Sequence, residues 1–362
     1  MSSPADLVTP AASVVLARSR QRIPSLDGLR AVSITLVLIG HVAGVKGVFG
    51  QSVFTNDLAA TGVGLFFVIS GFLITGLLRD EYVNGGTISL RNFYLRRFLR
   101  IFPVFYLYVG ITVALSALGI VVSSPRDILA SATYTTNYFV VRSPVLGHIW
   151  SLSVEEQFYL LWPGVIAFAG IVRARRVAIG AIILCGCLRF LYIWMRWRIH
   201  GQFFLVADSI ATGCLLAFKD DWLKRQSSFL RLVGLPYFPL LITLLIGLLK
   251  IYHGGRLMAI SASLTNFCLA LLVFRFVNFP SGVIADALNW KPVSLIGVWS
   301  YSLYLWHVLF INRDLHGPMT DFPLNLLCSI AAAVISYYVV ELPFLRLKNT
   351  IASREKKGTV RP

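Results

Sequence analysis

The chain has 362 residues, of which 57% are hydrophobic and only 14% are charged, and its mean hydropathy is +0.74. This composition excludes an ordinary soluble domain, because such domains carry about 25% charged residues. The net charge of +17 is compatible with binding either to nucleic acid or to a membrane surface, and the positions of the charges decide between the two.

Apolar runs recur along the whole chain, each close to the roughly 20 residues that a helix needs to cross a bilayer. They predict an all-α fold, a polytopic helical membrane protein with about ten transmembrane helices. In chain order the predicted spans are 26–46, 61–78, 101–121, 149–171, 177–195, 202–218, 229–250, 257–276, 294–312 and 323–342.

Most lysine and arginine residues fall in segments that these spans place on one side of the membrane. The main clusters lie at 79–100, 173–176 and 219–231 and in the tail from Arg346. Cytoplasmic loops are enriched in such residues, so the pattern predicts a cytoplasmic N-terminus and a cytoplasmic C-terminus. It also accounts for the net charge without nucleic acid, and we expect a multi-pass protein of the cytoplasmic (inner) membrane.

The predicted spans divide the chain into three segments. Residues 1–22 form a polar, basic cytoplasmic segment, residues 23–346 a membrane domain, and residues 347–362 a basic cytoplasmic tail. The interval 122–148 is predicted to be an external loop with a short interfacial or re-entrant helix. The five cysteines show no metal-binding or disulfide spacing, and we expect no metal.

Two ionisable side chains of the first span, Arg30 and His41, form the first candidate site. Eleven residues at about 100° each return to within about 20° of the same helix face, about 16 Å further along the axis. Ionisable residues cost about 2.5 to 3.5 kcal/mol, or more, to place inside a membrane, so they are seldom kept without a function.

A second pair, Arg97 and Arg100, lies three residues apart at the predicted cytoplasmic mouth of the third span. Residues at this spacing share a helix face, and two guanidinium groups on one face suit a phosphate-rich ligand. The simpler interpretation is that the arginines anchor the helix at the membrane surface.

Further ionisable residues lie at membrane depth or at its external boundary: Glu155, Glu156, Arg189, Asp208 and His307. Glu155 and Glu156 point about 100° apart, so at least one should face the protein interior. A carboxylate beside a histidine orients it and stabilises its charged form. Each residue by itself is better explained by helix packing, but together they indicate a hydrated, charged interior, typical of an enzyme or a transporter.

Seven segments resemble, in this order, those of a known family: LDGLRA followed by His41, GVGLFFVISGFLITGLL, RRFLRIFP, HIWSLSVEEQFYLLWP, ADSIATGCLLA, SYSLYLWH and VELPFLR. They extend over about residues 26–346. On these motifs the chain resembles the integral membrane acyltransferase 3 family, which includes bacterial O-antigen and Nod-factor O-acetylases.

The resemblance implies a membrane-bound O-acyltransferase that moves an acyl group, in the simplest case acetyl from acetyl-CoA, from cytoplasmic acyl-CoA to a hydroxyl group. The implied acceptor is a carbohydrate such as an exopolysaccharide, a lipopolysaccharide or a lipid-linked glycan, or another hydroxylated compound. Separate glycan-assembly proteins are implied partners. The activity would modify polysaccharides of the cell envelope by O-acetylation.

The family motifs also imply roles for individual residues. The R-x10-H motif makes Arg30 and His41 essential, the R-x-x-R motif places Arg97 and Arg100 near the CoA phosphates, and W-S-L-x-x-E points to Trp150 and Glu155. We therefore expect three catalytic residues (His41, Glu155, Arg30), two residues that bind acyl-CoA (Arg97, Arg100) and four that bind the substrates (Trp150, Glu156, Asp208, His307).

Two mechanisms stay open at this stage. His41 either deprotonates the acceptor hydroxyl for direct attack or accepts the acyl group itself and passes it on. Glu155 would orient His41 or relay the acceptor proton, and Arg30 would hold the pantetheine end or an oxyanion.

The alternative hypothesis is a secondary transporter or flippase for an anionic or glycosylated substrate, because proton-coupled transporters also use buried histidines and carboxylates. The arginine cluster at one mouth and the lack of an internal repeat favour the enzyme. A regulatory or scaffold protein would not need so many buried ionisable groups.

Overall fold

The computed structural model describes residues 23, 25–44, 53–197, 201–251, 257–312, 315 and 317–358. The predicted N-terminal segment 1–22 lies outside these residues. Helices make up 84% of the structure, and the described residues contain no strand, which confirms the all-α class.

The helices are α2 (Leu26–Gly44), α3 (Val53–Gly85), α4 (Leu90–Ala117), α5 (Pro125–Ala132), η2 (Thr136–Tyr138), α6 (Ile149–Trp194), α7 (Phe203–Leu223), α8 (Ser227–Gly234), α9 (Phe238–Ile251), α10 (Leu257–Asn278), α11 (Val283–Asn289), α12 (Lys291–Phe310), η3 (Pro318–Thr320), α13 (Leu324–Ser336), the π-helix η4 (Tyr337–Glu341) and α14 (Leu342–Gly358).

Seven helices of the described part of the chain are long and apolar enough to cross a membrane. They cover Leu26–Ala43, Asp57–Gly85, Leu90–Ala117, Ile149–Trp194, Ala259–Asn278, Lys291–Phe310 and Leu324–Thr350. The pair α8 and α9, bent by 81°, makes an eighth if the two helices form one span. The prediction of a polytopic helical membrane protein is therefore supported by the length and composition of these helices.

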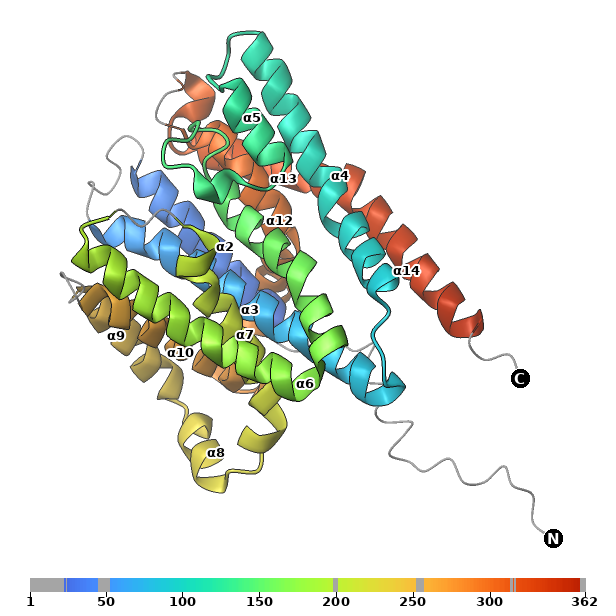
Figure 1. The fold of residues 1–362 in the computed structure, drawn as a ribbon. Coiled ribbons are helices and arrows are strands. Elements are labelled where there is room, and N and C mark those ends of the chain that lie inside the picture. The colour runs from blue at the N-terminus through green and yellow to red at the C-terminus, as the bar shows by residue number, and fades with distance from the viewer. Residues whose placement is uncertain are drawn as a thin grey trace.

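One of these helices, α6, contains two of the predicted spans. Its 46 residues are about twice what one crossing needs, and its ribbon changes direction sharply partway along (Figure 1). Gly170 has a φ of 75° and a ψ of 168° inside it. This backbone conformation is costly for residues with a Cβ atom, so glycine permits the break. The segments on either side correspond to the predicted spans 149–171 and 177–195.

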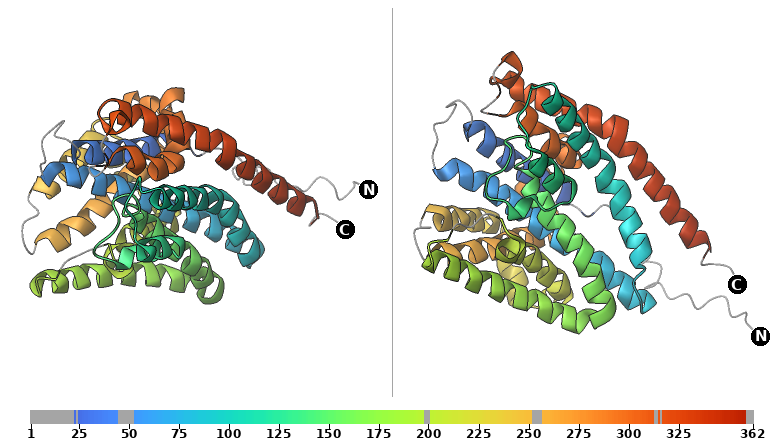
Figure 2. Two further views of the ribbon diagram at one scale, coloured as in Figure 1. Left: turned by 90° about the horizontal axis from the view of Figure 1, so that it is seen from above. Right: turned by 45° about the horizontal axis from the view of Figure 1, so that its top comes forward.

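Helices α2 and α3 lie side by side in the middle of the bundle (Figure 1). Helix α3 packs against α7, which packs against α6 and α10, while α2 packs against α12 and α12 against α13. Helices α4 and α14 run together along one side (Figure 2). Helix α14 continues through the boundary predicted at residues 346 and 347.

Glycines allow α3 and α7 to approach closely. A Cβ atom on Gly71 would overlap the carbonyl oxygen of Ile210, and one on Gly213 would overlap that of Val68. Small residues at such contacts bring helix backbones together where lipid provides no hydrophobic driving force. Gly71, within the segment GVGLFFVISGFLITG, therefore has a role in helix packing.

Candidate active site

A cavity of about 220 Å³ opens between α2, α3, α4 and α6. Its lining comprises Ile23, Leu26, Asp27, Arg30, Ser70, Leu73, Ile74, Leu77, Arg97, Arg100 and Tyr159. The structure thus brings Arg30 together with the Arg97 and Arg100 pair, which lies about 70 residues away in the chain. Asp27 also lines the cavity, and its Oδ1 lies 3.5 Å from Nη1 of Arg30, so three guanidinium groups outnumber this one carboxylate and the lining is positively charged.

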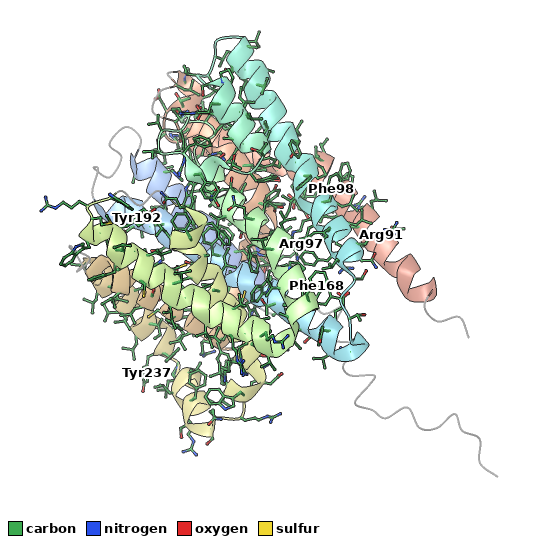
Figure 3. All side chains as sticks on the ribbon, viewed as in Figure 1. Arg91, Arg97, Phe98, Phe168, Tyr192 and Tyr237 are labelled. Carbon is green, nitrogen blue, oxygen red and sulfur yellow. The ribbon has the colours of Figure 1, made fainter. Side chains whose placement is uncertain are left out.

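Arg97 lies between α4 and α6, whereas Arg91 and Phe98 lie on the outer side of α4 (Figure 3). Its guanidinium carbon is 5.2 Å from the centroid of the Tyr159 ring and 5.7 Å from that of the Phe93 ring. Aromatic faces attract cations at this distance. They hold the guanidinium group of Arg97 at the cavity without neutralising its charge.

The carboxylate of Glu155 is hydrogen-bonded to a residue of the cavity lining, Ser70. The hydroxyl of Ser70 donates a hydrogen bond of 2.6 Å to Oε1 of Glu155 and accepts one of 3.1 Å from the hydroxyl of Tyr159. Glu155 also interacts electrostatically with the three cavity arginines. Because its hydrogen bond goes to Ser70, the structure places Glu155 with the cavity and gives His41 a different partner.

That partner is His307. Helices α2 and α12 pack together, and Nε2 of His307 lies 3.2 Å from Nδ1 of His41, although the two residues are 266 positions apart. Their ring centroids are 4.9 Å apart. The predicted site residues His41 and His307 therefore form one pair, at the opposite end of α2 from Arg30.

The hydrogen bonds of His307 determine which ring nitrogens carry protons. Its Nδ1 lies 3.1 Å from the carbonyl oxygen of Leu303 and 2.8 Å from that of Tyr304. A carbonyl oxygen only accepts, so Nδ1 of His307 is the donor, and Nε2 of the neutral ring is then an acceptor. It accepts from Nδ1 of His41, which leaves Nε2 of His41 unprotonated. That nitrogen has the lone pair required of a general base or a nucleophile.

A third imidazole, His148, lies against this pair at the start of α6. Its ring centroid is 5.5 Å from that of His307, and the side chain is only 7% exposed. Within the described residues neither of its ring nitrogens makes a hydrogen bond of good geometry, although the carbonyl group of Leu305 is close enough to interact with the ring. Burial, with a smaller effect of nearby His41, lowers the pKa of His148 to about 3, so its ring is neutral near pH 7.

Sequence reasoning did not select His148, although it opens the segment HIWSLSVEEQFYLLWP. A histidine at the end of a span is ordinarily an interfacial residue, and only the packing of α12 against α6 puts its ring beside His307.

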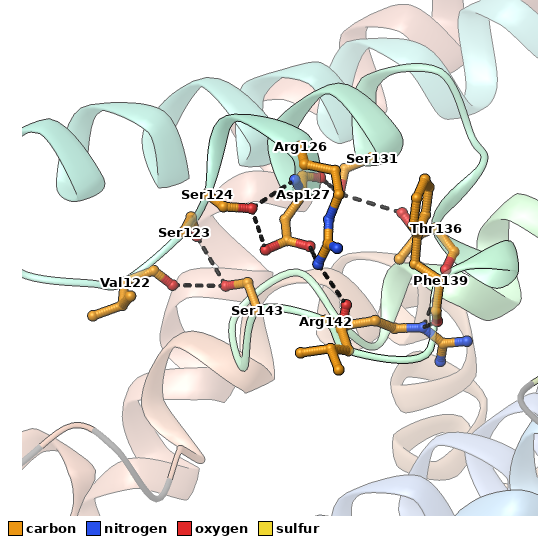
Figure 4. Close-up of polar contacts among 11 residues, drawn as sticks. Val122, Ser123, Ser124, Arg126, Asp127, Ser131, Thr136, Phe139, Arg142 and Ser143 are labelled. Carbon is orange, nitrogen blue, oxygen red and sulfur yellow. Dashed lines mark hydrogen bonds and ion pairs between the residues drawn. The ribbon is translucent and has the colours of Figure 1, made fainter.

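The segment before His148 is tied together by its own polar contacts (Figure 4). The hydroxyl of Ser124 accepts a hydrogen bond from the backbone N–H of Asp127 and so caps α5, and the hydroxyl of Ser143 donates to the carbonyl of Val122. The short helix expected within residues 122–148 is thus present as α5. Arg142 places its guanidinium carbon 5.9 Å from the ring of Trp150, which joins this segment to the start of α6.

Three residues assigned to substrate binding, Trp150, Glu156 and Asp208, are not part of the cavity lining. Trp150 packs edge-on against Phe67 of α3, at a centroid distance of 6.3 Å. Glu156 interacts electrostatically with Arg97 and Glu155. The roles of Trp150, Glu156 and Asp208 in binding remain predictions.

Asp208 belongs to a separate buried network. Both of its carboxylate oxygens accept hydrogen bonds from the guanidinium group of Arg189, at 2.8 and 2.6 Å. Asn266 and Ser263 of α10 also donate to Oδ2, at 3.0 and 3.1 Å. The network joins α6, α7 and α10, so its geometry fits a helix-packing role better than a place in the cavity.

One further buried carboxylate was not selected from the sequence. Glu341 ends the π-helix η4, is 4% exposed and accepts a hydrogen bond of 2.8 Å from the hydroxyl of Ser302. It also interacts electrostatically with Arg100. Its position in the motif VELPFLR was the sequence feature that could have indicated it. In the structure its place at the end of a π-helix points the same way, because π-helices often occur at functional sites.

The fold and the site define a multi-pass helical membrane protein with a partly buried imidazole pair and an arginine-lined cavity. Among the described residues, no group of three or more histidine, cysteine, aspartate or glutamate side chains could hold a metal ion. The family model described as an acyltransferase domain matches residues 23–341, and the chain belongs to this acyltransferase 3 family.

Curated relatives agree with this assignment. The chain is 31% identical to the O-acetyltransferase OatA of Staphylococcus aureus strain NCTC 8325 / PS 47 over 90% of its length. It is 30% identical to a putative O-acetyltransferase of S. aureus strain COL over 89% of its length. The matches cover 57% of the length of each relative, so the chain spans a little over half of these proteins. No solved structure matches the chain significantly.

Proposed function

We propose that the chain is a membrane-bound O-acyltransferase that transfers an acyl group, in the simplest case acetyl, from cytoplasmic acyl-CoA to a hydroxyl group of a carbohydrate. The observation that carries the proposal is the unprotonated Nε2 of His41, held by His307 on the helix whose other end lines the three-arginine cavity. The names of the relatives, O-acetyltransferases, support an acetyl donor and an oxygen acceptor.

The cavity suits the phosphate end of acyl-CoA. Guanidinium groups bind phosphate through paired hydrogen bonds, and Arg30, Arg97 and Arg100 provide three of them. Arg30 and His41 are separated by about 16 Å along α2. A donor with its phosphates at the cavity therefore needs an extended arm to bring its thioester to His41, and the pantetheine chain of CoA is such an arm.

The chemistry then follows from the tautomer of His41. Its Nε2 takes the proton of the acceptor hydroxyl as the hydroxyl oxygen attacks the thioester carbonyl. The C–S bond breaks, and the CoA thiolate receives that proton from His41 as it leaves. While His41 is charged, its Nδ1–H bond to Nε2 of His307 stabilises the imidazolium form. In the two-step route Nε2 of His41 attacks the thioester carbonyl and the CoA thiolate leaves as the C–S bond breaks. The acceptor oxygen then attacks the acyl-imidazole, the C–N bond breaks, and the acceptor proton leaves with the thiolate or with His41, so both routes use the same nitrogen.

The proposal includes ten transmembrane spans with both termini in the cytoplasm of a bacterial cell and the protein in the inner membrane. Helices α2, α3, α4, α10 and α12 would supply one span each, α6 two, α8 with α9 one, and α13 with α14 one. The tenth would be α7, which is not among the candidate helices given above. Arg97 and Arg100 then lie at the cytoplasmic mouth, where acyl-CoA is available. His41, at the other end of α2, lies toward the external side, where a glycan assembled by separate proteins would be modified.

The experiment that tests the function is release of free thiol from acetyl-CoA by the purified protein in nanodiscs, with and without a glycan extract. We expect His41→Ala to abolish release in folded protein. The double variant Arg97→Ala, Arg100→Ala should raise the KM for acetyl-CoA.

Arg91→Ala is the matched control, because Arg91 lies on the outer side of the same helix (Figure 3) and should leave KM unchanged. No thiol release by folded wild-type protein with any acyl-CoA would contradict the proposal and favour the transporter hypothesis. An unchanged KM in the double variant would remove the phosphate-binding role.

A further inference from the structure

We propose that His148 forms the subsite for the acceptor hydroxyl group, hydrogen bonding to it so that it faces Nε2 of His41. The inference rests on the proposed function and adds to it a residue that binds the acceptor. It starts from the unused hydrogen-bonding capacity of one buried side chain that packs against the imidazole pair.

His148 is buried, and among the described residues neither ring nitrogen makes a hydrogen bond of good geometry; the carbonyl group of Leu305 lies close enough to interact weakly with one of them. Buried polar groups are nearly always paired, because each one removed from water without a partner destabilises the fold. Such a group is retained where it serves the function and finds its partner in a ligand or in water. In His148 the two unpaired nitrogens belong to a single ring.

The ring of His148 is held in place through other contacts. The hydroxyl of Tyr304 donates a hydrogen bond of 2.9 Å to the main-chain carbonyl of His148 and lies 2.6 Å from the hydroxyl of Ser151. The ring itself packs edge to face against Tyr108 and His307, at centroid distances of 5.6 and 5.5 Å. Its polar atoms are therefore positioned in advance, as in a binding site.

The chemistry of the ring selects a hydroxyl group as the ligand. A neutral imidazole offers one N–H donor and one acceptor nitrogen, and a hydroxyl group likewise both donates and accepts. An anionic ligand would be favoured instead at the arginine cavity. Glu155, which is hydrogen-bonded to Ser70 of that cavity, lies seven residues beyond His148 on α6, about 10 Å along the helix. The hydroxyl and phosphate sites are thus separate.

His148 also lies beside the imidazole pair. Its ring contacts His307, the residue that holds Nδ1 of His41, and is close enough to His41 for the two rings to interact electrostatically. A hydroxyl bound to His148 would be next to the nitrogen that has to remove its proton. Because His148 itself takes no proton in this scheme, it acts by binding and orienting the acceptor.

The test compares His148→Leu with His148→Gln in nanodiscs, with acetyl-CoA as donor and N-acetylglucosamine as the probe acceptor. Without the probe, water is the acceptor and acetate release is measured. We expect His148→Leu to lower acceptor-dependent kcat/KM by about tenfold, the effect of one hydrogen bond. Its KM for acetyl-CoA should stay at the wild-type value and its Tm close to it, because leucine fills a similar volume between Tyr108 and His307 and no ring hydrogen bond of good geometry is lost. Gln, which also donates and accepts, should restore much of the activity.

Trp299→Phe is the control, since it removes another buried, unpaired N–H on α12, in a ring packed on Tyr338 instead of the histidines. Wild-type transfer rates in His148→Leu would overturn the inference alone. A raised KM for acetyl-CoA or a lowered Tm would show a structural role and overturn it as well. If the wild-type protein neither transfers nor hydrolyses the acetyl group, the proposed function fails, and this inference fails with it.

Discussion

Replacement of His307 by phenylalanine tests how the imidazole pair works. The phenyl ring has a similar size and shape but lacks Nε2, the atom 3.2 Å from Nδ1 of His41. His41 then loses the acceptor that stabilises its charged form during proton transfer. The lost carbonyl contacts of His307 at Leu303 and Tyr304 lie within a helix, where those carbonyls keep their backbone hydrogen bonds.

The magnitude follows from the type of hydrogen bond. A bond to a charged group contributes about 1.5 to 3 kcal/mol, and each 1.36 kcal/mol of transition-state stabilisation changes a rate about tenfold. We therefore expect kcat for thiol release to fall roughly 10- to 150-fold in His307→Phe. The KM for acetyl-CoA should not change, because the three cavity arginines are untouched.

The assay is the initial rate of thiol release at saturating acetyl-CoA, with folding checked by thermal unfolding of each variant. His307→Gln supplies an amide oxygen as an alternative acceptor and should recover part of the rate. A kcat within twofold of wild type in folded His307→Phe would refute the assignment of His307 as the residue that holds His41.

Two further predictions concern the scaffold. Asp208→Asn leaves the guanidinium group of Arg189 buried without its counter-charge, so we expect a loss of about 3 to 5 kcal/mol of stability and a lower Tm with an unchanged KM for acetyl-CoA. An unchanged Tm with a raised acceptor KM would instead support substrate binding by Asp208. Gly71→Ala puts a methyl group against the Ile210 carbonyl and should cost about 1 to 3 kcal/mol through overpacking. Gly76→Ala, which meets open space on the same helix, is the control, and equal Tm values for both would contradict close packing of α3 on α7.

The membrane-spanning helices could be predicted because the bilayer imposes a length and a composition on each of them. The ends of the helices were harder to predict from the sequence. Helix α3 runs over Val53–Gly85, well beyond the predicted span 61–78, because backbone hydrogen bonding continues into polar residues outside the hydrocarbon region. The basic residues at 173–176 indicated the turn between two spans, and the structure places the break nearby, at Gly170.

Part of the candidate site could likewise be predicted from the sequence, and part could not. Arg30, Arg97 and Arg100 could be found because charges in apolar segments are costly and therefore conspicuous. The spacing of Arg30 and His41 predicted that they share a helix face, but it did not predict which residues of other helices lie opposite that face. The partner of His41 was expected to be the carboxylate of Glu155, whereas the hydrogen bonds join His41 to His307 and Glu155 to Ser70.

The sequence by itself determined that the protein lies in a lipid bilayer, that it is all-α, and which ionisable residues belong to the site in most cases. Each of these depends on local composition and on the free-energy cost of charge in lipid. Only the tertiary structure decided which of these residues meet. The contact between His41 and His307 and the burial of His148 depend on how α2, α12 and α6 pack, and helix periodicity specifies the face of a residue without specifying what lies opposite. Whether the ring nitrogens of His148 have hydrogen-bond partners can be judged only from the packed structure, because it depends on every neighbouring side chain.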